Sequence, residues 1–128
     1  MPDARTGHTI VQRLKRRADF LAVSRARRSA GMPGVVLQVA PNRDASESLR
    51  VGFTASKKVG GAVKRNRAKR RLRELAATVL PTHGETGIDY VLIARNTTPD
   101  YPFPDLKQDF ERAMKRLKVW RPDRDKGM

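Results

Sequence analysis

The chain has 128 residues, of which 28 are lysine or arginine and 13 are aspartate or glutamate, so its formal charge is +15. This length suits one compact domain, and the charge is well beyond the roughly 2–8 units that solubility alone favours in a small domain. The sequence has no cysteine, which excludes disulfide scaffolds, thiolate zinc sites and cysteine nucleophiles. We therefore expect a polyanionic partner.

Nothing in the sequence predicts contact with a membrane. No apolar run approaches the roughly 20 residues that cross a bilayer, and residues 1–8 lack the apolar stretch of a secretory signal. We expect a cytoplasmic protein with a loose N-terminal arm over 1–12, a single domain over 13–120 that binds the polyanion, and a flexible polar tail over 121–128.

Local composition predicts six elements in the order α-β-β-α-β-α. They are a helix over 18–27, strands over 35–39 and 49–56, a long helix over 62–80 ended by Pro81, a strand over 88–94, and a last helix that begins at Pro104 and Asp105. A short extra strand near 28–32 is only weakly signalled. A long helix between two strands implies a βαβ unit with a parallel pair, so we predict an α+β fold with helices packed on a small mixed sheet.

The positive charge is concentrated in the middle of the chain. Residues 13–73 hold 18 lysines and arginines against three acids, a net of +15, whereas residues 74–128 hold nine of each sign. Charge added only for solubility has no reason to segregate in this way, so the pattern indicates an anion-binding face.

The predicted long helix is basic on one side. Seven of the ten residues from Lys64 to Arg73 are basic and none is acidic. At 100° per residue, Asn66, Arg70 and Arg73 point away from an apolar stripe that contains Ala68 and Leu72. Like charges three or four residues apart destabilise a helix, so we expect a phosphate backbone to relieve them. Arginine outnumbers lysine five to two in this stretch, which favours structured nucleic acid over a solvated face or a membrane surface.

Two motifs flank the start of the long helix. One is Arg-Val-Gly-Phe-Thr-Ala-Ser-Lys-Lys at 50–58, and the other is Arg-Asn-Arg at 65–67 followed by Ala-Lys-Arg-Arg-Leu-Arg-Glu at 68–74. Together they resemble the bacterial ribonuclease P protein component. A weaker similarity extends from about Leu14 to Leu117. The resemblance implies a βαβ unit with a left-handed crossover, similar to the second domain of ribosomal protein S5, against the usual right-handed preference.

The resemblance also implies a function. It implies the protein subunit of ribonuclease P, an endoribonuclease holoenzyme that removes the 5′ leader from precursor tRNA. The catalyst would be the RNA partner, which would hold most of the Mg²⁺, and the polypeptide would supply no catalytic residue. The partners would be ribonuclease P RNA and precursor tRNA, with no role for DNA.

Two sets of site residues are carried over from the family. Contacts with the catalytic RNA are expected at Lys64, Arg65, Asn66, Arg67, Lys69, Arg70, Arg71 and Arg73, and a cleft for the single-stranded leader at Phe20, Ser24, Gln38, Ser56, Lys57, Lys58 and Arg95. Phe20 could stack on a base or could be an ordinary core residue. Ser24 and Gln38 stand where relatives often have aromatic residues, so the expected cleft is poor in stacking groups.

Two other functions are compatible with the sequence. One is a general architectural or ribosomal RNA-binding protein without a processing role. The other is a stand-alone nuclease, for which Asp105, Asp109 and Glu111 are the clustered acids that could hold metal ions. Acids in the first turns of a helix are explained more simply by the helix dipole.

Overall fold

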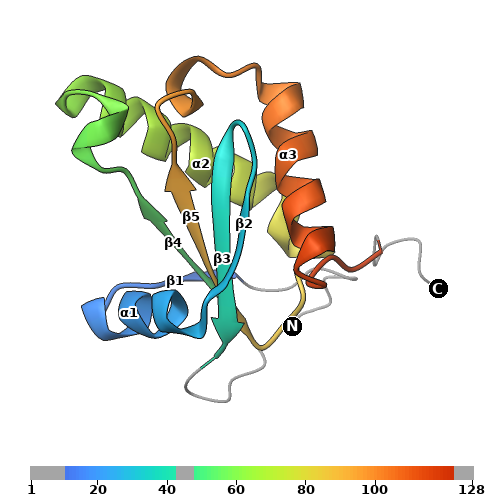
Figure 1. Cartoon of the computed structure of the whole chain (residues 1–128). Helices are drawn as coiled ribbons and strands as arrows, with labels where there is room; N and C mark the ends of the chain where they lie inside the picture. Colours follow the sequence, from blue (N-terminus) through green and yellow to red (C-terminus); the bar gives the residue numbers. More distant parts are fainter. Residues whose placement is uncertain (1–10, 43–47, 123–128) are drawn as a thin grey trace.

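A five-stranded sheet with three helices forms the fold (Figure 1), in a computed structural model that describes residues 11–42 and 48–122. The strands are β1 (Val11–Arg13), β2 (Arg28–Gly31), β3 (Val35–Pro41), β4 (Leu49–Thr54) and β5 (Ile88–Ala94). The helices are α1 (Arg17–Ala26), α2 (Ala62–His83) and α3 (Phe103–Arg116), with two 3-10 turns, η1 (Lys57–Val59) and η2 (Thr98–Asp100). The predicted α+β class is confirmed.

The sheet is mixed, in the order β1-β4-β5-β3-β2. β4 is parallel to both β1 and β5, whereas β3 is antiparallel to both β5 and β2. In Figure 1 both β4 and β5 run upward, β5 lies to the right of β4, and the connecting α2 passes behind the sheet. This arrangement makes the βαβ crossover left-handed, as the family resemblance implies.

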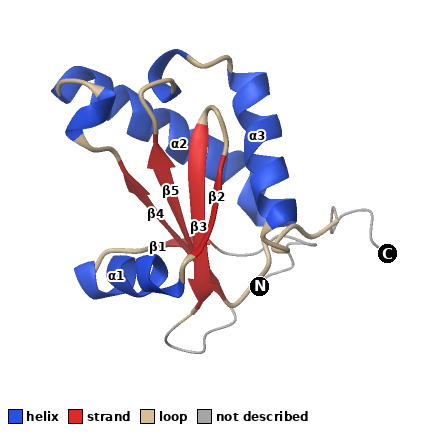
Figure 2. Cartoon of the chain, in the orientation of Figure 1, coloured by secondary structure: helices blue, strands red, loops and turns tan. Residues whose placement is uncertain are grey.

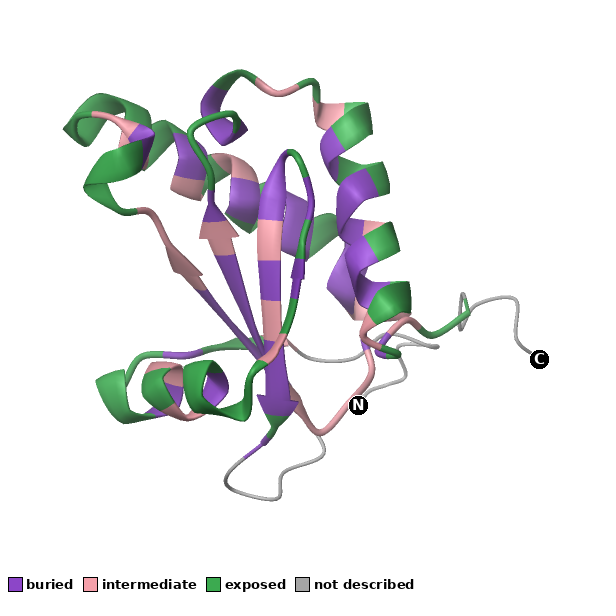
Figure 3. Cartoon of the chain, viewed as in Figure 1, coloured by how far each residue is buried: buried purple, intermediate pink, exposed green. Residues whose placement is uncertain are grey.

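The helices lie in two layers on opposite faces of the sheet (Figure 2). Side chains alternate along a strand, and in β5 Tyr90 and Leu92 belong to the main core with α2 and α3. Val91 points to the opposite face and belongs to a smaller core cluster beneath α1. Helix α1 packs on β3 and β5 and leaves part of this face of the sheet uncovered. Figure 3 shows buried and intermediate positions alternating along the first part of β3, whereas the middle of β5 is buried on both faces.

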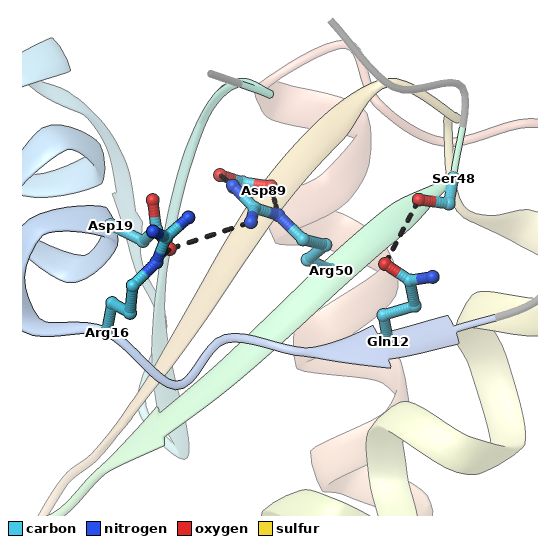
Figure 4. Close-up of polar contacts among 6 residues, drawn as sticks. All are labelled: Gln12, Arg16, Asp19, Ser48, Arg50 and Asp89. Carbon is cyan, nitrogen blue, oxygen red and sulfur yellow. Dashed lines mark hydrogen bonds and ion pairs between the residues drawn. The ribbon is translucent and has the colours of Figure 1, made fainter. Parts of the chain in front are cut away.

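A buried ion-pair network attaches α1 to the sheet (Figure 4). Arg50 in β4 donates two hydrogen bonds to Asp89 in β5, from Nε at 2.9 Å and from Nη2 at 2.7 Å. Its Nη1 atom lies 3.5 Å from Oδ2 of Asp19 in α1, which Arg16 approaches at 3.6 Å. Arg50 was counted in the positive surplus of residues 13–73, but its charge is neutralised inside the protein by Asp89 and Asp19.

Several predicted boundaries need correction. Val11 and Gln12, assigned to a loose arm, lie in β1, and the rest of that arm lies outside the described residues. The long helix does not stop before Pro81, because this proline lies in the last turn, where its missing amide donor and the crowding of the carbonyl four residues earlier affect only the end of the helix. The helix ends at His83, where the N–H of Gly84 donates to the Leu80 carbonyl at 3.0 Å.

The predicted tail also begins later than expected. The N–H of Arg121 donates to the His83 carbonyl at 2.7 Å, which joins this residue to the end of α2. Residues 123–128, the remainder of the predicted tail, lie outside the described residues. The weakly signalled strand near 28–32 is real and forms the edge strand β2.

Candidate nucleic-acid interface

The N-terminal half of α2 presents a basic face to solvent. Ala68, Leu72 and Leu75 are fully buried against the sheet, so the helix can turn only one side outward. The exposed polar residues of this half are named here the basic face: Lys64, Asn66, Arg67, Arg70 and Arg73. The orientation predicted from the 100° periodicity is confirmed.

Little of this positive charge is neutralised by the protein itself. Within the described residues, the basic face makes one ion pair, between Nη2 of Arg67 and Oδ1 of Asp100 at 3.4 Å. Both side chains are more than half exposed, and a pair of this kind contributes only about 0–1 kcal/mol. A polyanion can therefore displace it at small cost.

Three predicted RNA contacts are half-buried at the margins of the basic face: Arg65, Lys69 and Arg71. The guanidinium of Arg71 donates a hydrogen bond to the carbonyl of Tyr101 and lies 6.0 Å from the centre of the Phe103 ring. Arg71 thus fastens α2 to the start of α3. Its contact with RNA stays a prediction.

The face of the sheet that α1 leaves open contains two hollows along β3, named here the α1-face groove. The first, of about 530 Å³, contains three predicted leader residues, Ser56, Lys58 and Arg95. The second, of about 560 Å³, contains two more of them, Ser24 and Gln38. Val36 lines the first hollow, and it points to the same side of β3 as Gln38, about 7 Å away. The two hollows therefore follow one another along a single strand.

Phe20 is both a packing residue and a predicted groove residue. Its ring is half-buried in the small cluster that contains Leu14, Val23 and Val91. It lies directly on Gly52 of β4, because a Cβ atom built on that glycine would be 2.4 Å from Cζ of the ring. The core role is therefore shown, while stacking on a leader base stays a prediction.

Local hydrogen bonds position the polar end of the groove. The Oγ atom of Ser56 accepts a hydrogen bond from the N–H of Lys58 at 3.3 Å and caps η1. Nη1 of Arg95 donates to the Met32 carbonyl at 3.1 Å, which holds this side chain across the β2–β3 turn. Lys57 is exposed but lines neither hollow.

The groove also contains basic residues that the sequence reasoning did not single out. Arg25 and Arg27 line the second hollow together with Ser29. Arg27 ends α1 in the left-handed conformation, with φ of 58°, and its N–H donates to the Ser24 carbonyl. In the sequence, these residues are marked only by the run of arginines at the end of the predicted first helix. Their position beside Gln38 depends on the fold.

Two of the three acids considered as metal ligands have structural partners. Asp109 accepts a hydrogen bond from the N–H of Gly34 at 2.9 Å, and Glu111 pairs with Lys115 at 2.8 Å. Over residues 11–42 and 48–122, no group of three or more His, Asp or Glu side chains could hold a metal ion. In the same ranges, no helix combines the length and the apolar character needed to cross a bilayer.

These features define a class: a small α+β protein with two surfaces suited to polyanions, the basic face on α2 and the groove on the opposite side of the sheet. Residues 10–118 match the protein family Ribonuclease P. The chain belongs to this family, and it is a protein subunit of ribonuclease P.

Individual relatives agree with this assignment. The chain is 52% identical over 110 residues to the ribonuclease P protein component of Paramagnetospirillum magneticum, which covers 84% of the chain and 83% of the relative. It is 43% identical over 125 residues to that of Caulobacter vibrioides, covering 97% and 81%. Among solved structures, it is similar to the RNase P proteins of Staphylococcus aureus (29% identity, TM-score 0.70, covering 84% and 96%) and Thermotoga maritima (25%, 0.66, 82% and 96%).

Proposed function

We propose that the protein assists a catalytic RNA in removing the 5′ leader from precursor tRNA in the cytoplasm. The RNA partner binds the basic face of α2, and the leader lies in the α1-face groove. The chemistry of cleavage belongs to the RNA, and the polypeptide contributes binding energy only. The observation that carries the proposal is the basic face, which is exposed, almost free of protein carboxylates, and part of a chain in the ribonuclease P family.

The residue types of each surface suit the polyanion assigned to it. Arginine pairs with phosphate through two parallel hydrogen bonds, so Arg67, Arg70 and Arg73 favour an RNA whose phosphates are held in place by its own fold. The groove offers separate charges, Lys58 and Arg95 at one end and the α1 arginines at the other. Separate charges along a strand suit a flexible single-stranded leader, whose phosphates can adjust to them.

Magnesium is assigned to the RNA partner. The described residues do not fit a protein-held Mg²⁺ site, since their acids are engaged in Gly34, Lys115 and Arg50 contacts or stand apart. Magnesium prefers a few carboxylates together with phosphate oxygens, and the phosphates of folded RNA supply such oxygens. No step of the reaction is therefore assigned to a metal on the polypeptide.

Reconstitution tests the proposal. Ribonuclease P RNA is incubated with precursor tRNA and Mg²⁺, with and without the chain, and leader removal is measured at limiting substrate. We expect the chain to increase cleavage most strongly for substrates that carry a leader. Cleavage by the nucleic-acid-free polypeptide would support a stand-alone nuclease and overturn the proposal. Tight binding of the RNA without any effect on cleavage would favour an architectural role.

A further inference from the structure

A third hollow lies between the sheet edge and the C-terminal half of α2, and we name it the edge hollow. Its volume is about 330 Å³, at the lower end of the roughly 300–1,000 Å³ range of small-molecule sites. Its lining is apolar apart from two arginines: Val11, Arg13, Val51, Phe53, Arg73, Ala76, Ala77 and Pro81. No carboxylate of the described residues pairs with either arginine. The lining therefore suits a flat, largely apolar group that carries negative charge at its margin.

An aromatic ring positions one of the arginines. The guanidinium carbon of Arg13 lies 5.1 Å from the centre of the Phe53 ring, within the range of a cation–π contact. Arg13 pairs with Val51 in the β1–β4 register and points to the same face of the sheet as Phe53. Nucleobases stack both on aromatic rings and on the plane of a guanidinium group. The pair thus offers a stacking surface at the edge of the hollow.

The edge hollow continues the basic face. One line along α2, about 16 Å long, contains four residues at spacings of four, three and four: Asn66, Arg70, Arg73 and Ala77. Arg73 belongs to the basic face and also lines the hollow. Beyond Arg73, Ala77 carries the smallest side chain on this line, and the buried Ala76 beside it also lines the hollow, so a bound group can approach the helix closely.

We propose that the edge hollow binds one unstacked base of ribonuclease P RNA. The base lies against Ala77 and the Phe53–Arg13 pair, and its flanking phosphates are held by Arg13 and Arg73. This inference rests on the proposed function, because the occupant is the same RNA that lies on the basic face. The leader is not the occupant, since the α1-face groove lies on the other side of the sheet.

Filling the hollow tests the inference. Ala77→Leu adds a larger side chain to the hollow at an exposed position of α2, and leucine is a good helix former. Thr78→Leu is the matched control. Thr78 is also exposed, but it lines a different groove, between α2 and α3. Affinity for ribonuclease P RNA is measured at several salt concentrations. Losing a stacked base should weaken binding about tenfold, at the lower end of measured stacking effects. The salt slope should not change, because no phosphate contact is removed.

A second variant and a footprint keep the test decisive. Arg13→Lys retains the charge and loses the planar fork, so it should also weaken binding severalfold at an unchanged salt slope. Dimethyl sulfate probing should show one or two RNA bases that the wild-type chain protects and Ala77→Leu exposes. If wild type binds the RNA and Ala77→Leu matches Thr78→Leu in affinity and footprint, the edge hollow is not a base site. If wild type itself does not bind, the proposed function fails instead.

Discussion

Replacing Gly52 by alanine is expected to detach Phe20 from the sheet. A Cβ atom at this position would lie 2.4 and 2.5 Å from two carbons of the Phe20 ring and 3.2 Å from Cβ of Leu14. Carbon atoms in contact are normally 3.5–4.0 Å apart, so the ring must move by about 1 Å or more. Phe20 is half-buried and has room to swing outward, but α1 would lose part of its packing. Overpacking of this kind costs about 1–3 kcal/mol of unfolding free energy.

Urea unfolding and leader binding measure the two consequences of Gly52→Ala. The control is Gly31→Ala, on the same face of the sheet, where the nearest atoms lie at ordinary contact distances of 3.6 and 4.0 Å. We expect Gly52→Ala to lower the urea midpoint and to weaken binding of leader-bearing precursor tRNA, while affinity for ribonuclease P RNA stays within twofold. Equal stability of the two variants, with leader binding retained, would refute the packing of Phe20 on Gly52.

Three further changes test other parts of the structure. Asp89→Asn removes the bidentate carboxylate of the buried Arg50, which keeps Asp19 at 3.5 Å, and should destabilise the fold by roughly 1–3 kcal/mol in urea unfolding; a loss below 1 kcal/mol would contradict the network. Phe20→Ala should weaken binding of leader-bearing substrate and spare binding of ribonuclease P RNA, and an equal loss in both assays would contradict two separate surfaces. The Asp109 hydrogen bond raises the pKa of Tyr101 from 10.0, so stability should be lost as the pH rises through that raised pKa, and Tyr101→Phe should flatten this loss in unfolding experiments.

The elements with strong local signals were predictable from the sequence. The almost continuous apolar run at 88–94 became β5, and the alanine–leucine stripe of α2 fixed which side of the basic helix faces solvent. Both signals are local, because they depend only on the periodicity of one segment. The handedness of the crossover came from the family resemblance, since the general preference points the other way.

The features that could not be predicted from the sequence depend on contacts between distant segments. β1 is only three residues long, and it exists because Val11 to Arg13 pair with β4 almost 40 residues later. The Arg50–Asp89 pair joins two strands across the βαβ crossover, so a charge count treats both as surface charges. The α1-face groove combines Lys58, Arg95 and Gln38 from three parts of the chain. The run of arginines at the end of the first helix is a local signal of positive charge, but it does not reveal that Arg25 and Arg27 lie beside Gln38.

The salt dependence of binding to ribonuclease P RNA tests the basic face most directly. We expect the logarithm of the association constant of the wild type to fall steeply and linearly with the logarithm of salt concentration. Arg70→Ala should reduce that slope by about 0.7–0.9, the value for one lost phosphate contact. Lys107→Ala, an exposed change on α3, should leave the slope unaltered. A flat wild-type dependence, or the same slope for Arg70→Ala as for wild type, would contradict the assignment of RNA binding to α2.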